Sequence, residues 1–118
     1  MKNVRLAVVG GRDFQDYELL KRSIDELCKH HEVVTIVSGG AAGADTLGER
    51  YAKEKGLNTI IHKPEWDRYG RSAGFRRNRL IVRDSDVVAA FWDGTSKGTK
   101  STINLAEEAG VEPHIYSY

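Results

Sequence analysis

A glycine-rich segment that follows a run of β-favouring residues carries the strongest chemical signal in this chain. Residues 38–45 (SGGAAGAD) come directly after residues 33–37 (VVTIV), and a helical pattern begins near Asp45. Glycine lets the backbone turn tightly and approach a ligand closely, because it has no Cβ. The unpaired N–H groups of the first helical turn, with the positive end of the helix dipole, then face an anion. The pattern predicts a site for a phosphate or carboxylate, and a nucleotide or its derivative is the expected ligand.

A second turn rich in glycine and hydroxyl groups precedes a later helical pattern. Residues 93–99 (DGTSKGT) do not match the phosphate loop GxxxxGK[ST], because Thr99 stands where that motif needs lysine after Gly98. Residues 38–45 likewise differ from the dinucleotide fingerprint GxGxxG, since their first two glycines are adjacent. Both turns still suit a phosphate at a helix N-terminus. The alternative, that each turn only begins a helix, stays open.

The first glycine turn supplies a cation and a carboxylate beside two small residues. Gly10 and Gly11 would admit a ligand, while Arg12 and Asp13 follow directly as a cation and an acceptor. A plain turn in which Asp13 or Asp16 caps the next helix is the alternative. Asp13 and Asp45 are the candidates for a catalytic carboxylate, although their spacing assigns neither residue that role. Whether the chain is an enzyme stays open.

Six arginines and no acidic residue lie within residues 68–83. The planar fork of arginine suits phosphate oxygens, although a solvated basic helix face is the alternative. Within this segment, we expect Phe75 to pack into the core. The aromatic rings near this segment and near residues 93–99 are suited to stacking on a base, but packing is their commoner role; they are Trp66, Tyr69 and Trp92.

Strand and helix patterns alternate along the whole chain. Apolar runs predict strands at residues 4–9, 33–37, 59–62, 86–92 and 111–116, and helical periodicity predicts helices at residues 16–30, 43–55, 72–83 and 98–109. Alternation of this kind predicts an α/β protein: a single Rossmann-like, doubly wound domain over residues 1–118. We expect a mainly parallel five-stranded sheet with helices on both faces, and Pro113 places the last strand at its edge. The glycine turns then meet at the carboxyl ends of the strands.

Composition narrows the class of protein further. The chain has 118 residues and a formal net charge of +1, which gives no general reason to expect nucleic acid as a partner. No apolar run approaches the roughly 18–20 residues that span a bilayer, so we expect no membrane partner. Cys28 is the only cysteine, which favours the reducing cytoplasm, and we expect its thiol to be buried and inert. The four histidines show no metal-ligand spacing, and no metal site is predicted.

Five segments together resemble the SLOG superfamily, and in particular its YspA-type, cpYpsA-related branch. They are VVGGRDF (8–14), VSGGAAGAD (37–45), Lys63-Pro64, GFRRN (74–78) and FWDGTSKGT (91–99). The resemblance covers nearly the whole chain and implies a Rossmann-like domain that binds nucleotide derivatives as a sensor or carrier. It implies the following ligand-binding residues: Gly10, Gly11, Arg12, Ser38, Gly39, Gly40, Gly43, Asp45, Arg77, Asn78, Gly94, Gly98 and Thr99.

The resemblance also sets the order of the functional hypotheses. Lonely Guy phosphoribohydrolases of this superfamily carry an acid shortly after a Gly-Thr pair, whereas Gly98-Thr99 is followed here by Lys100, Ser101 and Thr102. Binding of a nucleotide-derived small molecule is therefore the leading hypothesis, and hydrolysis of its N-glycosidic or phosphate bond is the alternative. A third hypothesis, by analogy with the DNA-uptake protein DprA, places single-stranded nucleic acid on the arginine segment. The resemblance further implies a homodimer, and it identifies no cofactor.

Overall fold

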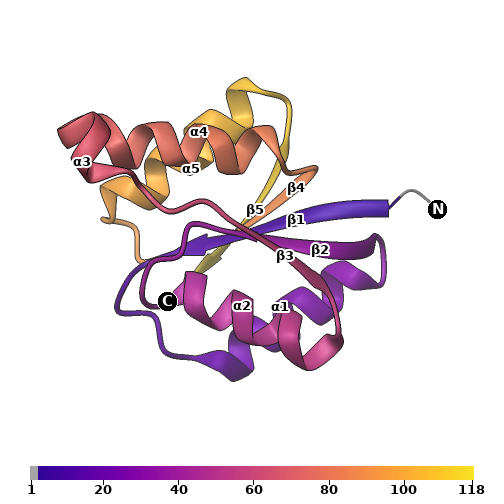
Figure 1. Ribbon diagram of the computed structural model, residues 1–118. Helices are drawn as coiled ribbons and strands as arrows, with labels where there is room; N and C mark the ends of the chain where they lie inside the picture. Colours follow the sequence, from indigo (N-terminus) through magenta and orange to yellow (C-terminus); the bar gives the residue numbers. More distant parts are fainter. Residues whose placement is uncertain (1–2) are drawn as a thin grey trace.

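The computed structural model describes residues 3–118, in which strands and helices alternate (Figure 1). The strands are β1 (Asn3–Gly10), β2 (Glu32–Ser38), β3 (Asn58–Ile61), β4 (Val87–Trp92) and β5 (Glu112–Ser117). The helices are α1 (Tyr17–Cys28), α2 (Ala44–Lys55), α3 (Trp66–Tyr69), α4 (Ala73–Arg83) and α5 (Lys97–Glu108). A single 3-10 turn, Gly70–Ser72, joins α3 to α4. The predicted elements are all present, and the short helix α3 lies in a segment that the sequence predicted as loop.

The strands form one parallel sheet in the order β3-β2-β1-β4-β5. The chain first moves outward from β1 to β3 and then crosses to the other side of β1 to add β4 and β5. The strand order therefore reverses between β1 and β4, which is the topological switch point of a doubly wound sheet. This confirms the predicted Rossmann-like α/β fold. Pro113 lies on the edge strand β5, as predicted.

The two faces of the sheet bury separate apolar layers. Helices α1 and α2 cover one face, and α4 and α5 cover the other (Figure 1). Along β1, Leu6 and Val8 pack beneath α1 and α2, whereas Ala7 and Val9 pack beneath α4 and α5. A strand covered on both faces needs apolar residues at consecutive positions, which explains the unbroken apolar runs of β1 and β4.

The sequence predicted that the side chains of Phe75 and Cys28 are buried, and the structure places them differently. Phe75 is 50% exposed, so its predicted place in the core is wrong. It lies in the first turn of α4 and lines a surface groove together with Trp92 and Gly94, at and beyond the end of β4. Cys28 packs against the core and is partly buried, with its Sγ 3.7 Å from the hydroxyl of Tyr51. Among residues 3–118, no helix is long and apolar enough to cross a bilayer.

Candidate functional site

A cavity of about 450 Å³ opens at the carboxyl ends of β1 and β4, where the strand order reverses. Its walls come from the β1–α1 turn, the loop before α2, the middle of α4 and the β4–α5 turn. This is where doubly wound sheets bind their ligands. The lining residues are Val9, Gly10, Gly11, Arg12, Asp13, Ala41, Asp45, Arg77, Asn78, Ile81, Asp93, Ser96, Gly98, Thr99 and Thr102.

The cavity brings together part of the predicted set of ligand-binding residues. Those that line it are Gly10, Gly11, Arg12, Asp45, Arg77, Asn78, Gly98 and Thr99. The others lie outside this lining: Gly40 lines an adjoining cavity, Gly94 lines the groove beside Phe75, and Ser38 and Gly39 are buried. Gly43 has a φ of +80°, and a Cβ there would overlap the carbonyl oxygen of Gly11. Its role in the structure is thus to let two loops pack closely.

The 38–45 loop is held by hydrogen bonds within itself. The Asp45 carboxylate accepts from the backbone N–H groups of Gly39 (3.1 Å) and Ala41 (3.2 Å). The Ser38 hydroxyl accepts from the N–H of Gly40 at 3.1 Å and lies 2.7 Å from the Glu49 carboxylate, to which it donates. Three N–H groups that the sequence suggested for a phosphate therefore already have partners. The loop shapes the cavity wall, and side chains supply most of the polar groups that face a ligand.

Arg77 joins the 38–45 loop to α4 and also faces the cavity. Its Nη1 donates to the Gly39 carbonyl at 2.6 Å, and its Nε donates to the side-chain oxygen of Asn78 at 2.9 Å. Burial lowers the pKa of Arg77, the Asp45 carboxylate raises it, and the positive charge of Arg12 lowers it further. Two guanidinium groups therefore lie close enough to repel each other at one cavity. Within residues 3–118, neither of them forms an ion pair.

Asp45 is the buried carboxyl of the site. Burial raises its pKa to about 6, although the N–H groups of Ala41 and Gly39 and the charge of Arg77 favour the ionised form. The cost of desolvating the carboxylate thus outweighs the hydrogen bonds and the nearby cation. At neutral pH the group is ionised and partly balances the two arginines.

The β4–α5 turn is ordered by its own side chains. The Asp93 carboxylate accepts from the N–H groups of Thr95 (2.9 Å) and Ser96 (2.8 Å), and these bonds lower the pKa of Asp93. Ser96 caps α5 by accepting from the N–H of Thr99 at 3.4 Å. Ser96 in this turn and Thr99 and Thr102 in α5 line the cavity. Across the cavity, Asp13 accepts from the hydroxyl of Tyr118 at 2.7 Å.

Basic side chains continue from the cavity over α3 and α4. Arg12 and Arg77 also line an adjoining cavity of about 360 Å³, together with Lys63, Pro64 and Trp66. A groove of about 380 Å³ lies next to it and is lined by Lys63, Glu65, Tyr69, Ala73, Arg76, Arg77, Arg79, Leu80 and Arg83. We call this the α3–α4 groove.

Aromatic rings lie among these cations. The Trp66 side chain is 51% exposed. The guanidinium carbons of Arg68 and Arg76 lie 5.0 and 4.3 Å from the centre of the Tyr69 ring. Packing was the role expected from sequence for both rings, but half of Trp66 faces solvent beside the basic residues. The sequence signals for this surface are the six arginines of residues 68–83 and the aromatic residues at the start of that segment, Trp66 before it and Tyr69 within it.

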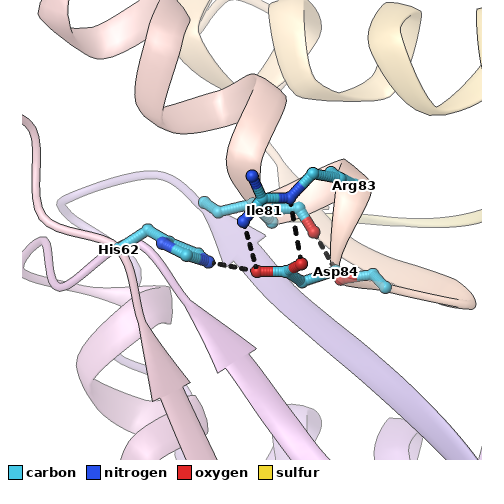
Figure 2. Close-up of polar contacts among 5 residues, drawn as sticks. His62, Ile81, Arg83 and Asp84 are labelled. Carbon is cyan, nitrogen blue, oxygen red and sulfur yellow. Dashed lines mark hydrogen bonds and ion pairs between the residues drawn. The ribbon is translucent and has the colours of Figure 1, made fainter.

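A polar clamp ties the segment after β3 to the end of α4 (Figure 2). Asp84 lies 2.6 Å from Nε2 of His62, and it accepts from Nε and Nη2 of Arg83 at 3.1 and 3.3 Å. The hydrogen bond from Arg83, followed by that from His62, lowers the pKa of Asp84. Ser85 closes the helix end by donating to the Ile81 carbonyl at 2.6 Å. The clamp holds Lys63, the next residue after His62, beside the basic face of α4.

A parallel sheet with a ligand-sized cavity at its switch point defines this chain as a Rossmann-like α/β protein. The chain belongs to the YspA, cpYpsA-related SLOG family, whose model matches residues 4–69. It is 33% identical over 114 residues to the gene 61 protein of Mycobacterium phage D29, and the match covers 91% of each chain. The family resemblance read from the five sequence segments is therefore confirmed.

Two solved structures share the fold. The DNA processing protein A of Helicobacter pylori, described for its single-stranded DNA binding mode, has a TM-score of 0.73 and 24% identity. The DNA processing protein A (DprA) of Streptococcus pneumoniae has a TM-score of 0.75 and 22% identity. Each match covers 95% of this chain but only 64% and 50% of the respective solved chains. These similarities establish the fold of the shared region.

Proposed function

We propose that the cavity at the switch point binds a nucleotide or nucleotide-derived small molecule, and that the protein is a sensor or carrier of that ligand. The main support for this proposal is that Arg12 and Arg77 line the same cavity. Two guanidinium groups that repel each other create a place where a bound anion lowers the electrostatic energy. The cavity volume of about 450 Å³ lies within the usual range for small-molecule sites.

The polar groups around the arginines suit the other parts of a nucleotide. Thr99 and Thr102 line the cavity from the first two turns of α5, and the dipole at the N-terminus of this helix favours a phosphate. The adjoining cavity offers the half-exposed ring of Trp66 as a stacking surface for the base.

Binding is favoured over hydrolysis because the candidate catalytic carboxylates have other partners. The Asp45 carboxylate accepts hydrogen bonds from the N–H groups of Gly39 and Ala41, and the Asp13 carboxylate accepts one from the Tyr118 hydroxyl. A general base or nucleophile needs to reach the reacting bond or a water beside it. Hydrolysis of a glycosidic or phosphate bond stays the alternative, with Asp13 and Asp45 as its candidate residues.

Thermal unfolding and calorimetry test the binding proposal. AMP, ADP-ribose, NAD and inorganic phosphate would each be added at millimolar concentration, and we expect at least one nucleotide to raise Tm. Arg12→Ala removes an exposed side chain from the cavity, and we expect it to weaken binding of that nucleotide about tenfold or more. Gly98→Ala adds a methyl group on the cavity wall, where no other atom lies within 4 Å of the new Cβ. It should weaken binding without lowering Tm.

The matched control is Arg22→Ala, which removes an exposed arginine from α1 on the other face of the sheet. It should leave the affinity unchanged. The proposal fails if no nucleotide changes Tm, or if Arg12→Ala and Gly98→Ala both bind as the wild type does.

A second candidate function is the binding of single-stranded DNA along the α3–α4 groove. The shared fold with the Helicobacter pylori protein favours it, as do the arginines that line the groove beside Tyr69. Single-strand sites commonly combine a cationic groove with aromatic stacking surfaces. The net charge of +1 argued against this function from sequence, but the structure gathers the cations on one surface.

Fluorescence anisotropy with a labelled oligothymidylate separates this function from nucleotide binding. The double variant Arg76→Ala/Arg79→Ala should lower affinity and reduce the slope of log K against log salt by about 1.4, since each phosphate contact contributes about 0.7. The control, Lys21→Ala/Arg22→Ala on α1, should keep the slope. Single-strand binding is excluded if the oligonucleotide does not bind at low salt, whatever the free nucleotides do.

A further inference from the structure

Three side chains with metal-ligating atoms meet at the edge of the sheet, at the end opposite the switch-point cavity. They are His31, in the turn between α1 and β2, and Glu112 and His114, on β5. Their ligand atoms all lie within 4.8 Å of one another. We propose that these three residues bind a Zn²⁺ ion.

The contact between His114 and Glu112 fits coordination better than a hydrogen bond. Nε2 of His114 lies 2.9 Å from Oε1 of Glu112 but forms no hydrogen bond, and Nε2 is shielded from solvent. A shielded ring nitrogen without a hydrogen bond is rare and calls for another partner. Two ligand atoms that each lie about 2.0–2.1 Å from a common tetrahedral ion come about 3.3 Å apart without being aligned with each other. The observed distance of 2.9 Å lies near this separation.

The backbone holds the three ligands in place before a metal binds. Glu112 and His114 occupy alternate positions of β5, so their side chains leave the same face of the sheet. They pair with Val87 and Ala89, which belong to the apolar layer beneath α1 and α2. His31 lies three residues after the end of α1 and directly before β2, and its N–H donates to the Leu27 carbonyl at 3.1 Å. A helix end and an edge strand therefore present their ligands to one point.

The donor set selects the class of metal. Two imidazoles and one carboxylate suit Zn²⁺ and neighbouring transition metals, whereas Ca²⁺ and Mg²⁺ prefer oxygen ligands alone. The Glu112 side chain is 57% exposed, so a fourth position is open to water. The ion would join the α1–β2 turn to the edge strand β5. The site is independent of the proposed nucleotide cavity, because none of its residues lines that cavity.

Zinc titration of the full chain without a histidine tag tests the proposal. We expect one Zn²⁺ per chain in competition with a chromophoric chelator, a Co²⁺ complex with the visible absorption of a tetrahedral site, and a rise in Tm on adding Zn²⁺. Glu112→Gln and His31→Ala should each weaken zinc binding at least about tenfold and abolish the rise in Tm. Both variants should unfold like the wild type when a chelator removes metal, which separates a lost ligand from a damaged fold.

His30→Ala is the matched control, because His30 is exposed in the same turn but lies outside the cluster. It should bind Zn²⁺ as the wild type does. The proposal is overturned if the wild type shows no binding at 100 μM Zn²⁺. It is also overturned if Glu112→Gln and His31→Ala keep wild-type affinity, or if His30→Ala loses as much affinity as His31→Ala.

Discussion

The buried carboxyl of Asp45 gives the protein a pH-dependent stability that Asp45→Asn should remove. Burial raises the pKa of Asp45 from the ordinary 3.8 to about 6 in the folded chain. The folded state then binds the proton more tightly than the unfolded state does. Between these two pKa values, each rise in pH lowers the free energy of unfolding, because ionisation is easier in the unfolded chain. This loss of free energy of unfolding is absent below about pH 3 and nearly complete above about pH 6.5.

The magnitude follows from the two pKa values. This difference between the folded and unfolded pKa of Asp45 lowers the free energy of unfolding by about 3 kcal/mol at pH 7 and by about 1 kcal/mol at pH 4.5. The asparagine variant has no ionisable group at this position and keeps one acceptor oxygen for the loop N–H groups. Its free energy of unfolding should therefore rise relative to that of the wild type by about 2 kcal/mol between pH 4.5 and pH 7. The change with pH is informative even if the substitution also weakens the loop at every pH.

Urea unfolding followed by tryptophan fluorescence at four pH values from 4.5 to 7.5 measures this difference. A difference between the two proteins that stays constant with pH would show that Asp45 titrates at its ordinary value. If the free energy of unfolding of Asp45→Asn instead falls relative to that of the wild type as the pH rises, the N–H groups of Gly39 and Ala41 and the charge of Arg77 outweigh burial. Either result would refute the argument for a carboxyl with a raised pKa in the cavity wall.

Two further comparisons test the packing of the loops and the polar clamp. Gly43→Ala should lower the free energy of unfolding by about 3 kcal/mol, because Gly43 has a positive φ and a Cβ there would overlap Gly11. Gly94 has a φ of +88° but no atom near its Cβ position, so Gly94→Ala should lower the free energy of unfolding by only about 1 kcal/mol. Equal losses in urea unfolding would show that overlap on Gly11 adds nothing. Asp84→Asn should cost about 1–2 kcal/mol at pH 7, since it weakens charge-assisted hydrogen bonds. Because the pKa of Asp84 is lowered in the folded chain, this stabilisation should decrease as the pH falls below the ordinary value of 3.8 towards the lowered one, and a loss that does not change on acidification would contradict its electrostatic origin.

Much of the fold could be predicted because it depends on periodicity along the chain. The apolar run at residues 86–92 predicted the strand β4, and Pro113 predicted the edge position of β5. Helical spacing located the four longer helices, but α3 has only four residues, too few to show a repeat. The turns that line the cavity could also be predicted, because parallel strands bring their carboxyl ends to one edge of the sheet.

By itself, the sequence determined the order of strands and helices, the family and the edge of the sheet where the glycine turns meet. Only the tertiary structure decided which groups face the cavity. The N–H groups of Gly39 and Ala41 turn to Asp45, and Arg12 and Arg77 converge from separate elements. It likewise brought His31 to β5 from a distant part of the chain. The physical reason is that backbone periodicity is a local property, whereas hydrogen-bond partners and burial depend on residues that meet only when the chain has folded.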